Sequence, residues 1–253
     1  MLKILEARRQ QQHRTRPFPP ADPRLSDRFL GRPVVDFARC GPDCEGCAAR
    51  CPTGAIRRDE SGRRILDLGR CLFCGACAES CPAKAIRFTS DYSLSARRRE
   101  DLLLDSAALK KVEALQAAQL RLFGRSLKLR QVSAGGCNAC EADCNVLNTP
   151  VFDLARFGIQ FVASPRHADG LLVTGPVTEN MKQAVQKTYD AVPAPKLVIA
   201  VGSCAISGGP YADHRQVQNG VAGLLPVDLC IPGCPPHPYT ILDGLLRLLG
   251  HMR

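Results

Sequence analysis

Two stretches of the chain repeat one cysteine pattern, and this repeat constrains the fold more than any other feature of the sequence. The first reads CEGCAARCPTGAIR from Cys44, and the second reads CGACAESCPAKAIR from Cys74, thirty residues later. Each copy ends in Cys-Pro-x-x-Ala-Ile-Arg. The leading cysteines, Cys40 and Cys71, depart from this offset by one residue, because the first copy has an extra residue in the loop 41–43. Four closely spaced cysteines, present twice, indicate metal binding.

The fourteen cysteines of this 253-residue chain are more consistent with bound metal than with disulfide bonds. Disulfide-rich scaffolds belong to secreted proteins. The N-terminal stretch MLKILEARRQQQHRTRPFPP lacks the apolar core of a secretory signal. No stretch approaches eighteen consecutive apolar residues, so we expect no membrane span. A reducing cytoplasm is therefore expected, where cysteine clusters bind metal or take part in catalysis.

The spacing C-x2-C-x2-C-x3-C-P from Cys71 is that of bacterial ferredoxins, in which three close cysteines bind one 4Fe–4S cubane and the fourth reaches the other. The proline after the last cysteine stops the chain from continuing as a helix into its cluster. Residues 33–92 thus resemble a two-cluster ferredoxin domain with an α+β ferredoxin-like fold. The predicted ligands are Cys40, Cys44, Cys47 and Cys81 (set A) and Cys71, Cys74, Cys77 and Cys51 (set B). Paired zinc ribbons are the alternative, disfavoured because zinc motifs rarely carry such a repeat ending in proline.

The composition divides the rest of the chain into three parts. Residues 1–32 form a basic arm with eight Lys or Arg against three acids, either a solvated tail or a segment that docks on an acidic partner or an anionic membrane face. Residues 93–124 are rich in Leu, Ala, Arg and Glu and predict a helical linker that ends at Gly124. In residues 125–253, short apolar runs alternate with helical stretches, which predicts parallel strands with covering helices. The expected strands lie within 127–132, 159–163, 170–175, 196–202 and 227–233, and the expected helices within 149–158 and 178–192.

The formal charge of +10 does not indicate nucleic-acid binding. Four thiolates around a cubane leave a net charge of about −2, so three clusters would lower the total to about +4. Aromatic residues make up only 5% of the chain and are not interleaved with Lys and Arg, unlike in nucleic-acid-binding surfaces. A basic protein with structural metal is therefore the disfavoured alternative.

Six cysteines remain after residue 136, and they are dispersed in the sequence. Three of the expected strands each run directly into one of them, at Cys137, Cys204 and Cys234. The carboxyl ends of parallel strands share one edge of a sheet, where sites form. We therefore expect four thiols to meet there around a third cubane, with neighbouring glycines allowing close backbone approach. This predicted ligand set, set C, is Cys137, Cys140, Cys204 and Cys234, and the glycines are Gly135, Gly136, Gly202 and Gly233.

Four segments, GGCNACEAD, FGIQFVASPRHADGLLVTGPVT, AVGSCAISGG and PVDLCIPGCPPHP, resemble the small, cluster-bearing subunit shared by NiFe-hydrogenases and respiratory complex I. The resemblance covers roughly residues 125–250 and implies an α/β flavodoxin-like parallel-sheet domain, with the cluster on set C next to the active site of a partner large subunit. Complex I subunits have two adjacent cysteines at the first position, so the C-x-x-C from Cys137 resembles the hydrogenase branch, above all the membrane-bound group 4 enzymes and formate hydrogenlyase. Ala139 stands where that group usually has Gly, and His237 where it usually has Arg.

The resemblance implies an electron-transfer subunit of a membrane-associated NiFe-hydrogenase or formate-hydrogenlyase-like complex, with three 4Fe–4S clusters and no catalytic residue of its own. The implied partners are a hydrogenase or complex I-like large subunit, membrane-arm subunits and a second redox partner such as ferredoxin or formate dehydrogenase, with no nucleic acid. The implied location is cytoplasmic and peripheral, on the inner face of the cell membrane. The alternative is a subunit of a complex I-like quinone-reducing complex, or of a hydrogenase-related complex without NiFe.

Several further residues have both a functional and a structural interpretation. Candidates for an interface or a proton relay are Glu141, Asp143, Arg166 and His167. The two acids are otherwise ordinary residues of a helix N-terminus, and His167 either tunes the cluster by a hydrogen bond or is a loop histidine without a metal role. Cys144 is expected to be a small buried residue rather than a spare ligand. Cys230 falls on an expected strand and is expected in the core as well.

Overall fold

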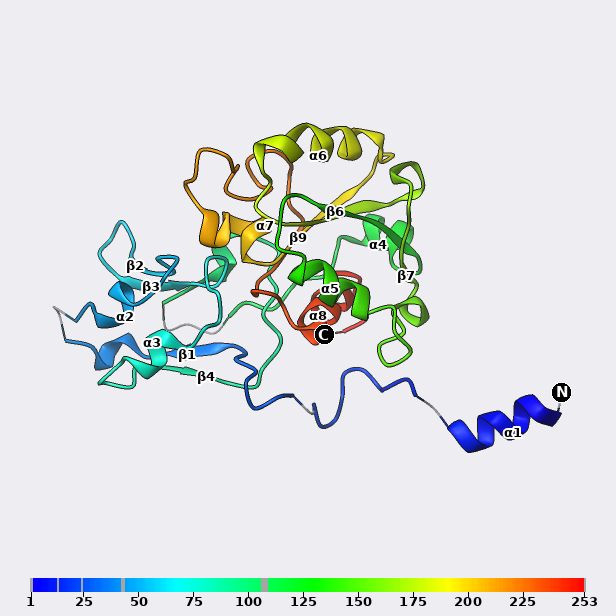
Figure 1. Cartoon of the computed structure of the whole chain (residues 1–253), viewed down its shortest axis with the longest axis horizontal. Coiled ribbons are helices and arrows are strands. Elements are labelled where there is room, and N and C mark those ends of the chain that lie inside the picture. Colours follow the sequence, from blue (N-terminus) through cyan, green and yellow to red (C-terminus); the bar gives the residue numbers. More distant parts are fainter. Residues whose placement is uncertain (1, 13, 24, 42–43, 106–108, 253) are drawn as a thin grey trace.

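A five-stranded parallel sheet forms the C-terminal part of the chain in the computed structural model, which describes residues 2–12, 14–23, 25–41, 44–105 and 109–252 (Figure 1). Each run predicted as a strand contains one. The strands are β6 (Leu127–Ser133), β7 (Ile159–Phe161), β8 (Gly170–Thr174), β9 (Leu197–Val201) and β10 (Leu229–Ile231). Their spatial order is β10-β9-β8-β6-β7, so β7 is added on one side of β6 and the later strands on the other, which places a switch in strand order between β6 and β8. Sheets wound in this way bind ligands beyond the carboxyl ends of their strands.

Both faces of this sheet are buried, and successive side chains of a strand alternate between two cores. In β8, Leu171 and Val173 pack into one core and Leu172 into the other. Figure 1 shows α6 on one side of the sheet and α5 with α8 on the other. The near-continuous apolar runs of the sequence follow from burial on both faces. The helices are α5 (Ala139–Val146), α6 (Glu179–Ala191), α7 (Ser203–Ser207) and α8 (Pro238–Leu248).

The two helices expected from the sequence in this part have different outcomes. The prediction for 178–192 is confirmed by α6. The prediction for 149–158 is wrong beyond one short 3-10 turn, η3 (Leu154–Phe157). Asp153, before this turn, has a left-handed backbone with φ 48°, and Gly158, after it, has φ 75°. A regular helix cannot pass through either position.

Short elements build residues 33–92, and the two cysteine repeats fold alike. Each Cys-Pro-x-x-Ala-Ile-Arg motif leads into a strand, and each cysteine triplet carries one helical turn. One antiparallel pair is formed by β1 and β4, and β2, β3 and β5 form a second antiparallel sheet. This is an α+β arrangement. The elements are β1 (Pro33–Val35), η1 (Phe37–Arg39), α2 (Gly46–Ala49), β2 (Ile56–Arg58), β3 (Arg64–Asp67), α3 (Ala76–Glu79) and β4 (Ile86–Phe88).

The prediction that residues 93–124 form a helical linker is mostly wrong. Among the described residues of this segment, only α4 (Ala117–Phe123) is an α-helix, capped by Gly124 as expected, while η2 (Glu100–Leu102) and β5 (Leu103–Leu104) occupy the earlier part. Residues 106–108 lie outside the described residues. Leu104 is buried in the sheet with β3, and the Leu115 N–H donates to the Leu248 carbonyl at 2.9 Å. Tertiary packing therefore overrides a helix propensity that is only a weak preference.

The N-terminal arm has two parts with different surroundings. Helix α1 (Leu2–Gln11) lies apart from the rest of the molecule (Figure 1). Beyond it the chain packs on the folded body: the Arg16 N–H donates to the Val151 carbonyl at 3.0 Å, and the Phe18 ring centroid lies 5.8 Å from that of Tyr239. The interpretation as a solvated tail is therefore wrong for the part of the arm from Arg16 onward. Among the described helices, none has the length and apolarity needed to cross a membrane.

Candidate iron-sulfur centres

The four thiols of set A lie close to one another. Burial raises the pKa of Cys47, and the thiols of Cys40, Cys81 and Cys44 raise it further. Burial also raises the pKa of Cys40, against the opposing effect of the Arg64 guanidinium. The fourth member, Cys81, comes from the other repeat, so the chain crosses over as the ferredoxin spacing predicts.

The four thiols of set B line one apolar cavity of about 20 Å³. Burial raises the pKa of the Cys71 thiol to about 12, and the neighbouring thiols of Cys77, Cys51 and Cys74 add to this. Here Cys51 is the member contributed by the other repeat. The thiolate forms of four such side chains repel each other, so holding them together deprotonated needs a bound cation.

Backbone amides point at the sulfurs in the same way in both repeats. The Ala55 N–H donates to Cys51 Sγ at 3.2 Å, and the Ala85 N–H donates to Cys81 Sγ at 3.3 Å. These are equivalent positions of the two Cys-Pro-x-x-Ala motifs. The Phe73 N–H donates to Cys71 Sγ at 3.3 Å. Such bonds favour the thiolate, which is the form that ligates iron.

Set C forms at the carboxyl edge of the parallel sheet, as the strand pattern predicts. Cys137 follows β6, Cys204 lies on α7 just after β9, and Cys234 follows β10. Burial raises the pKa of Cys204 to about 11, and the thiols of Cys234 and Cys137 raise it further. Burial also raises the pKa of Cys140, on α5, with Cys204 as its strongest charged neighbour.

Gly202 shows how tightly the backbone surrounds set C. Its φ is +88°, and a Cβ placed on it would lie 2.5 Å from Cys140 Sγ. Only glycine therefore fits between β9 and this sulfur. Within the described ranges, no three His, Cys, Asp or Glu side chains are arranged to hold a single metal ion. A cubane requires a wider arrangement, because each thiolate binds its own iron atom.

The three sets follow one another across the molecule. Cys47 of set A contributes to the raised pKa of Cys77 in set B, after burial and the thiols of Cys51 and Cys74. Leu72 lines the cavity of set B and also a second cavity of about 260 Å³ that is lined by Cys234 of set C. Set B thus lies between sets A and C.

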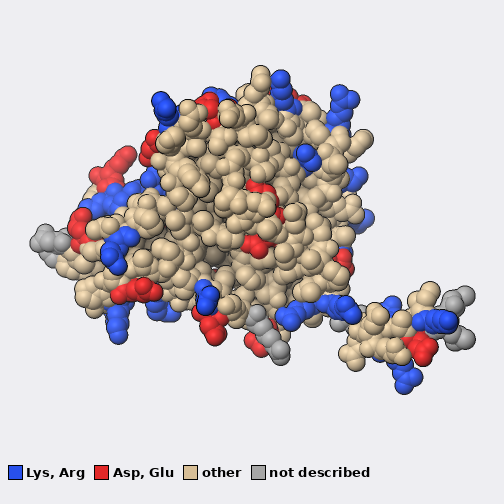
Figure 2. Space-filling model, in the orientation of Figure 1, with Lys and Arg blue, Asp and Glu red and all other residues tan. Residues whose placement is uncertain are grey.

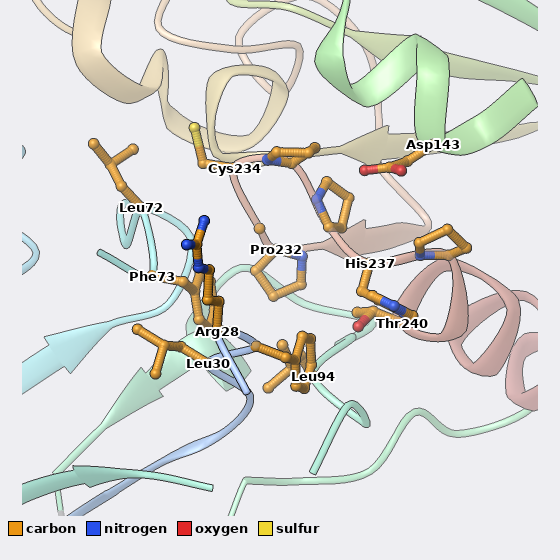
Figure 3. Close-up of a pocket in the computed structure, with 15 residues that line it drawn as sticks. Arg28, Leu30, Leu72, Phe73, Leu94, Asp143, Pro232, Cys234, His237 and Thr240 are labelled. Atoms are coloured by element: carbon orange, nitrogen blue, oxygen red, sulfur yellow. The ribbon is translucent and has the colours of Figure 1, made fainter. Parts of the chain in front are cut away.

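The cavity at Cys234 is walled by the arm on one side and the sheet domain on the other. Figure 3 shows Arg28 of the arm pointing toward the loop of Cys234, with Asp143 approaching from α5. Burial raises the pKa of Asp143. Burial lowers the pKa of His237, whose Nδ1 accepts a hydrogen bond from the Tyr239 N–H at 3.1 Å. His237, one of the two residues at which the chain departs from the group it resembles, therefore caps α8.

Glu141 is fixed between two strand ends. Its Oε1 accepts hydrogen bonds from Ser133 Oγ and Thr174 Oγ1, both at 2.6 Å, and its side chain is buried beside Cys140. These two hydroxyls were not among the residues predicted from the sequence. The sequence could have pointed to them, because both are the last residues of strands, β6 and β8, whose ends meet at this edge of the sheet.

Arg166 and His167 lie away from set C. Both belong to η4 (Pro165–His167), before the start of β8, whereas the sulfurs lie beyond the ends of the strands. A five-residue strand is about 16 Å long. The structural interpretation of His167 as a loop residue fits this position better than a hydrogen bond to a cluster. Cys144 and Cys230 are buried members of the two cores, in agreement with their structural interpretation.

The face of the molecule over α5 carries few charged side chains at its centre. In Figure 2, the centre of the face over α5 is largely uncharged with a few acidic side chains, and Lys and Arg lie mostly around its rim. Cys137 and Cys234 are exposed. The site is therefore accessible to another molecule.

Comparison with known proteins agrees with this geometry. The family model described as NADH ubiquinone oxidoreductase, 20 Kd subunit, matches residues 137–248, and a 4Fe-4S dicluster domain model matches residues 39–85. A probable membrane-bound hydrogenase subunit of Pyrococcus furiosus is 38% identical over 58% of this chain and 88% of its own length. Formate hydrogenlyase subunit 7 of Escherichia coli is 42% identical over 55% of this chain and 54% of its own length. An NADH-quinone oxidoreductase subunit of Heliobacterium modesticaldum is 44% identical over 46% of this chain and 66% of its own length.

The two matches divide the chain as its cysteine blocks do. The dicluster match ends at residue 85, before the segment that leads into the sheet, and the second match begins at Cys137, the first cysteine of set C. The relative from Pyrococcus is matched over most of its length. The chain belongs to the family of the 20 kDa subunit of NADH ubiquinone oxidoreductase, and in it this subunit is joined to a 4Fe–4S dicluster domain.

Proposed function

We propose that the chain is the electron-transfer subunit of a membrane-associated NiFe-hydrogenase or formate-hydrogenlyase-like complex, with three 4Fe–4S clusters bound by sets A, B and C. The observation that carries this proposal is the grouping of twelve cysteines into three adjacent fours. Relatives named as a membrane-bound hydrogenase subunit and a formate hydrogenlyase subunit support the type of complex. We also propose that the sheet domain has a flavodoxin-like fold, which its strand order supports.

A bound 4Fe–4S cluster supplies one-electron oxidation and reduction. The work of this chain's residues is to hold and tune it. The amides of Ala55, Ala85 and Phe73 donate to ligand sulfurs and stabilise their negative charge. Gly202 leaves room for Cys140 beside the end of β9. The bond chemistry takes place on a partner subunit.

The exposed cysteines and their surroundings suggest how the chain is assembled. We expect a hydrogenase or complex I-like large subunit to cover the uncharged face over α5, next to Cys137 and Cys234. A second redox partner, such as ferredoxin or formate dehydrogenase, is expected at set A, the far end of the series. Membrane-arm subunits would hold the complex on the inner face of the cell membrane. Glu141 and Asp143 remain candidates for a proton relay at the large-subunit interface.

A second candidate function is that of a complex I-like quinone-reducing complex, or a hydrogenase-related complex without NiFe. The relative named as part of an NADH-quinone oxidoreductase favours it. The C-x-x-C of Cys137 and Cys140 favours the hydrogenase assignment.

The test is to purify the complex without oxygen, through a tag on this chain, and to assay nickel and hydrogen-dependent reduction of a viologen dye. The hydrogenase assignment predicts nickel together with dye reduction. A Cys137→Ala variant should lose dye reduction, while Cys144→Ala, a substitution in the core beside the site, should keep it. Abundant iron without nickel or hydrogen activity, in a complex that retains its large subunit, would contradict the assignment and favour the quinone-reducing alternative.

A further inference from the structure

One buried hydroxyl joins the backbone of set B to the backbone of set C. Ser203 is the first residue of α7 and precedes Cys204; its Oγ donates to the Cys71 carbonyl at 2.6 Å. Cys71 and Cys204 belong to different sets and to different parts of the fold. The serine is 1% exposed, so water does not compete for this bond.

Ser203 also holds the second strand end that carries set C. Its own N–H donates to the Gly233 carbonyl at 2.9 Å, and its Oγ lies 3.2 Å from the same oxygen. Because the amide already satisfies Gly233, the single proton of the hydroxyl is free for the Cys71 carbonyl. Gly233 directly precedes Cys234. A continuous path therefore runs from Cys71 through one hydrogen bond to Ser203, and from there by covalent bonds to Cys204 and by a second hydrogen bond toward Cys234.

The turn that presents the Cys71 carbonyl is itself fixed by a buried carboxylate. Asp67 is fully buried, and its side chain pairs with Arg99 at 2.6 Å and Arg57 at 2.9 Å. The Gly69 N–H donates to Asp67 Oδ1 at 2.9 Å, and the Cys71 N–H donates to the Asp67 carbonyl at 3.0 Å. The carbonyl of Cys71 therefore meets Ser203 in a fixed orientation rather than at the end of a loose loop.

We propose that Ser203 is a positioning residue for electron transfer: its hydroxyl sets the distance and the bonded path between set B and set C. The proposal rests on the proposed function, since it needs clusters on both sets. The step is a one-electron exchange, in which one side is oxidised and the other is reduced by the same electron, with no proton or leaving group. A hydrogen bond couples the two sides more strongly than a van der Waals gap, because the donor and acceptor atoms approach more closely.

Ser207 provides a matched control one helical turn along α7. Its Oγ donates to the Gly69 carbonyl at 2.8 Å and lies 3.1 Å from the Ser203 carbonyl. It therefore joins the same two parts of the fold and is also buried. Neither Gly69 nor Ser207 belongs to a cysteine set, and the Ser207 hydroxyl reaches the carbonyl of Gly69 rather than that of Cys71. Ser207 therefore joins the two parts of the fold without a direct bond to a residue of set B.

The experiment compares S203A, S207A and the unmodified full chain, purified without oxygen and checked for equal iron content. Each protein is reduced by a flash-generated soluble one-electron donor, and the arrival of the electron at the different clusters is followed by rapid-freeze electron paramagnetic resonance. Equilibrium redox titration gives the midpoint potentials, and pulsed dipolar measurements give the spacing of the reduced clusters. The iron content and the number of clusters are measured before electron transfer is followed. A missing cluster in the unmodified chain would therefore contradict the proposed function and would say nothing about Ser203.

We expect S203A to slow transfer between sets B and C several-fold with midpoint potentials unchanged, and S207A to behave as the unmodified chain. Transfer at the normal rate in S203A would overturn the proposal, and so would equal slowing in both variants, since that would reduce Ser203 to a packing contact. If S203A alone loses iron, S203T, which keeps the hydroxyl, becomes the test. Normal transfer in S203T supports the proposal, and slowed transfer in S203T with normal cluster spacing overturns it.

Discussion

The two cysteine-bearing regions bring their thiols together in different ways. In residues 33–92 the cysteines are close in sequence, and the elements around them are no longer than four residues. In the sheet domain the cysteines are far apart in sequence, and β6, β9 and β10 bring them together at one edge. Helical turns this short are not stable alone, whereas the parallel sheet has a core on each face. The buried residues of the first region belong to one of these cores only, so we expect it to depend more on bound metal for folding than the sheet domain does.

Removing the metal should separate the two regions most strongly. Chelation of iron under mild oxidation should abolish amide protection in β1–β4 and leave β6, β8 and β9 protected, because the short elements of the first region gain more of their folding free energy from metal binding than the sheet domain does. Hydrogen exchange with mass spectrometry, before and after iron removal, measures this directly. Equal loss of protection in both regions would break the comparison.

Single cysteine substitutions should show the same difference between the two regions at individual sites. Cys74 is exposed and belongs to set B, so Cys74→Ala should remove about one third of the iron and expose β2 and β4 to exchange. Cys144 is fully buried in the core of the sheet domain. Cys144→Ala should keep all of the iron and lower the free energy of unfolding by about 1–2 kcal/mol, through the cavity it leaves. Iron content and thermal unfolding of both variants give the answer, and iron loss in Cys144→Ala would make it a ligand.

A buried carboxylate should matter more to the first region than a surface one. Asp67 is fully buried between Arg57 and Arg99, whose side chains are 40% and 29% exposed. Asp67→Asn should lower stability by about 3 kcal/mol, the low end of the range for a broken buried pair, because water partly solvates the two arginines left behind. Thermal unfolding of the iron-loaded chain measures the loss. Asp59→Asn, which breaks the exposed pair with Arg63, is the control and should change the unfolding temperature little; an equal effect would remove Asp67 from the account.

The smallest effect should separate set A from set B. The Arg64 guanidinium acts on Cys40 of set A and donates to the Cys44 carbonyl at 2.6 Å, whereas set B lines an apolar cavity. Arg64→Gln removes a positive charge beside set A, so the extra electron of a reduced cluster there becomes less stable. We expect the midpoint potential of this cluster to fall by tens of millivolts while that of set B stays constant. Redox titration followed by electron paramagnetic resonance measures both, and a shift shared by the two clusters would contradict the assignment.

The sequence was sufficient for the features that rest on local spacing or strong periodicity. The strand runs are apolar on both faces, so all five strands were predicted, and the cysteines that follow three of them marked the edge at which set C forms. The linker 93–124 was not predictable, because its helix-forming residues pack against β3 and α8 instead. The hydrogen bonds by which Ser203 and Ser207 connect the two parts of the fold were not predictable either. Their partners, Cys71 and Gly69, are more than 130 residues away in the sequence, and only the tertiary structure brings them together.

The measurement that tests the central claim most directly is a count of iron, inorganic sulfide and zinc on the full chain purified without oxygen, together with electron paramagnetic resonance after reduction. We expect about twelve iron and twelve sulfide per chain, four for each set, with spectra of three interacting 4Fe–4S clusters. Zinc in place of iron at sets A and B, or iron for only two clusters with set C metal-free, would contradict it.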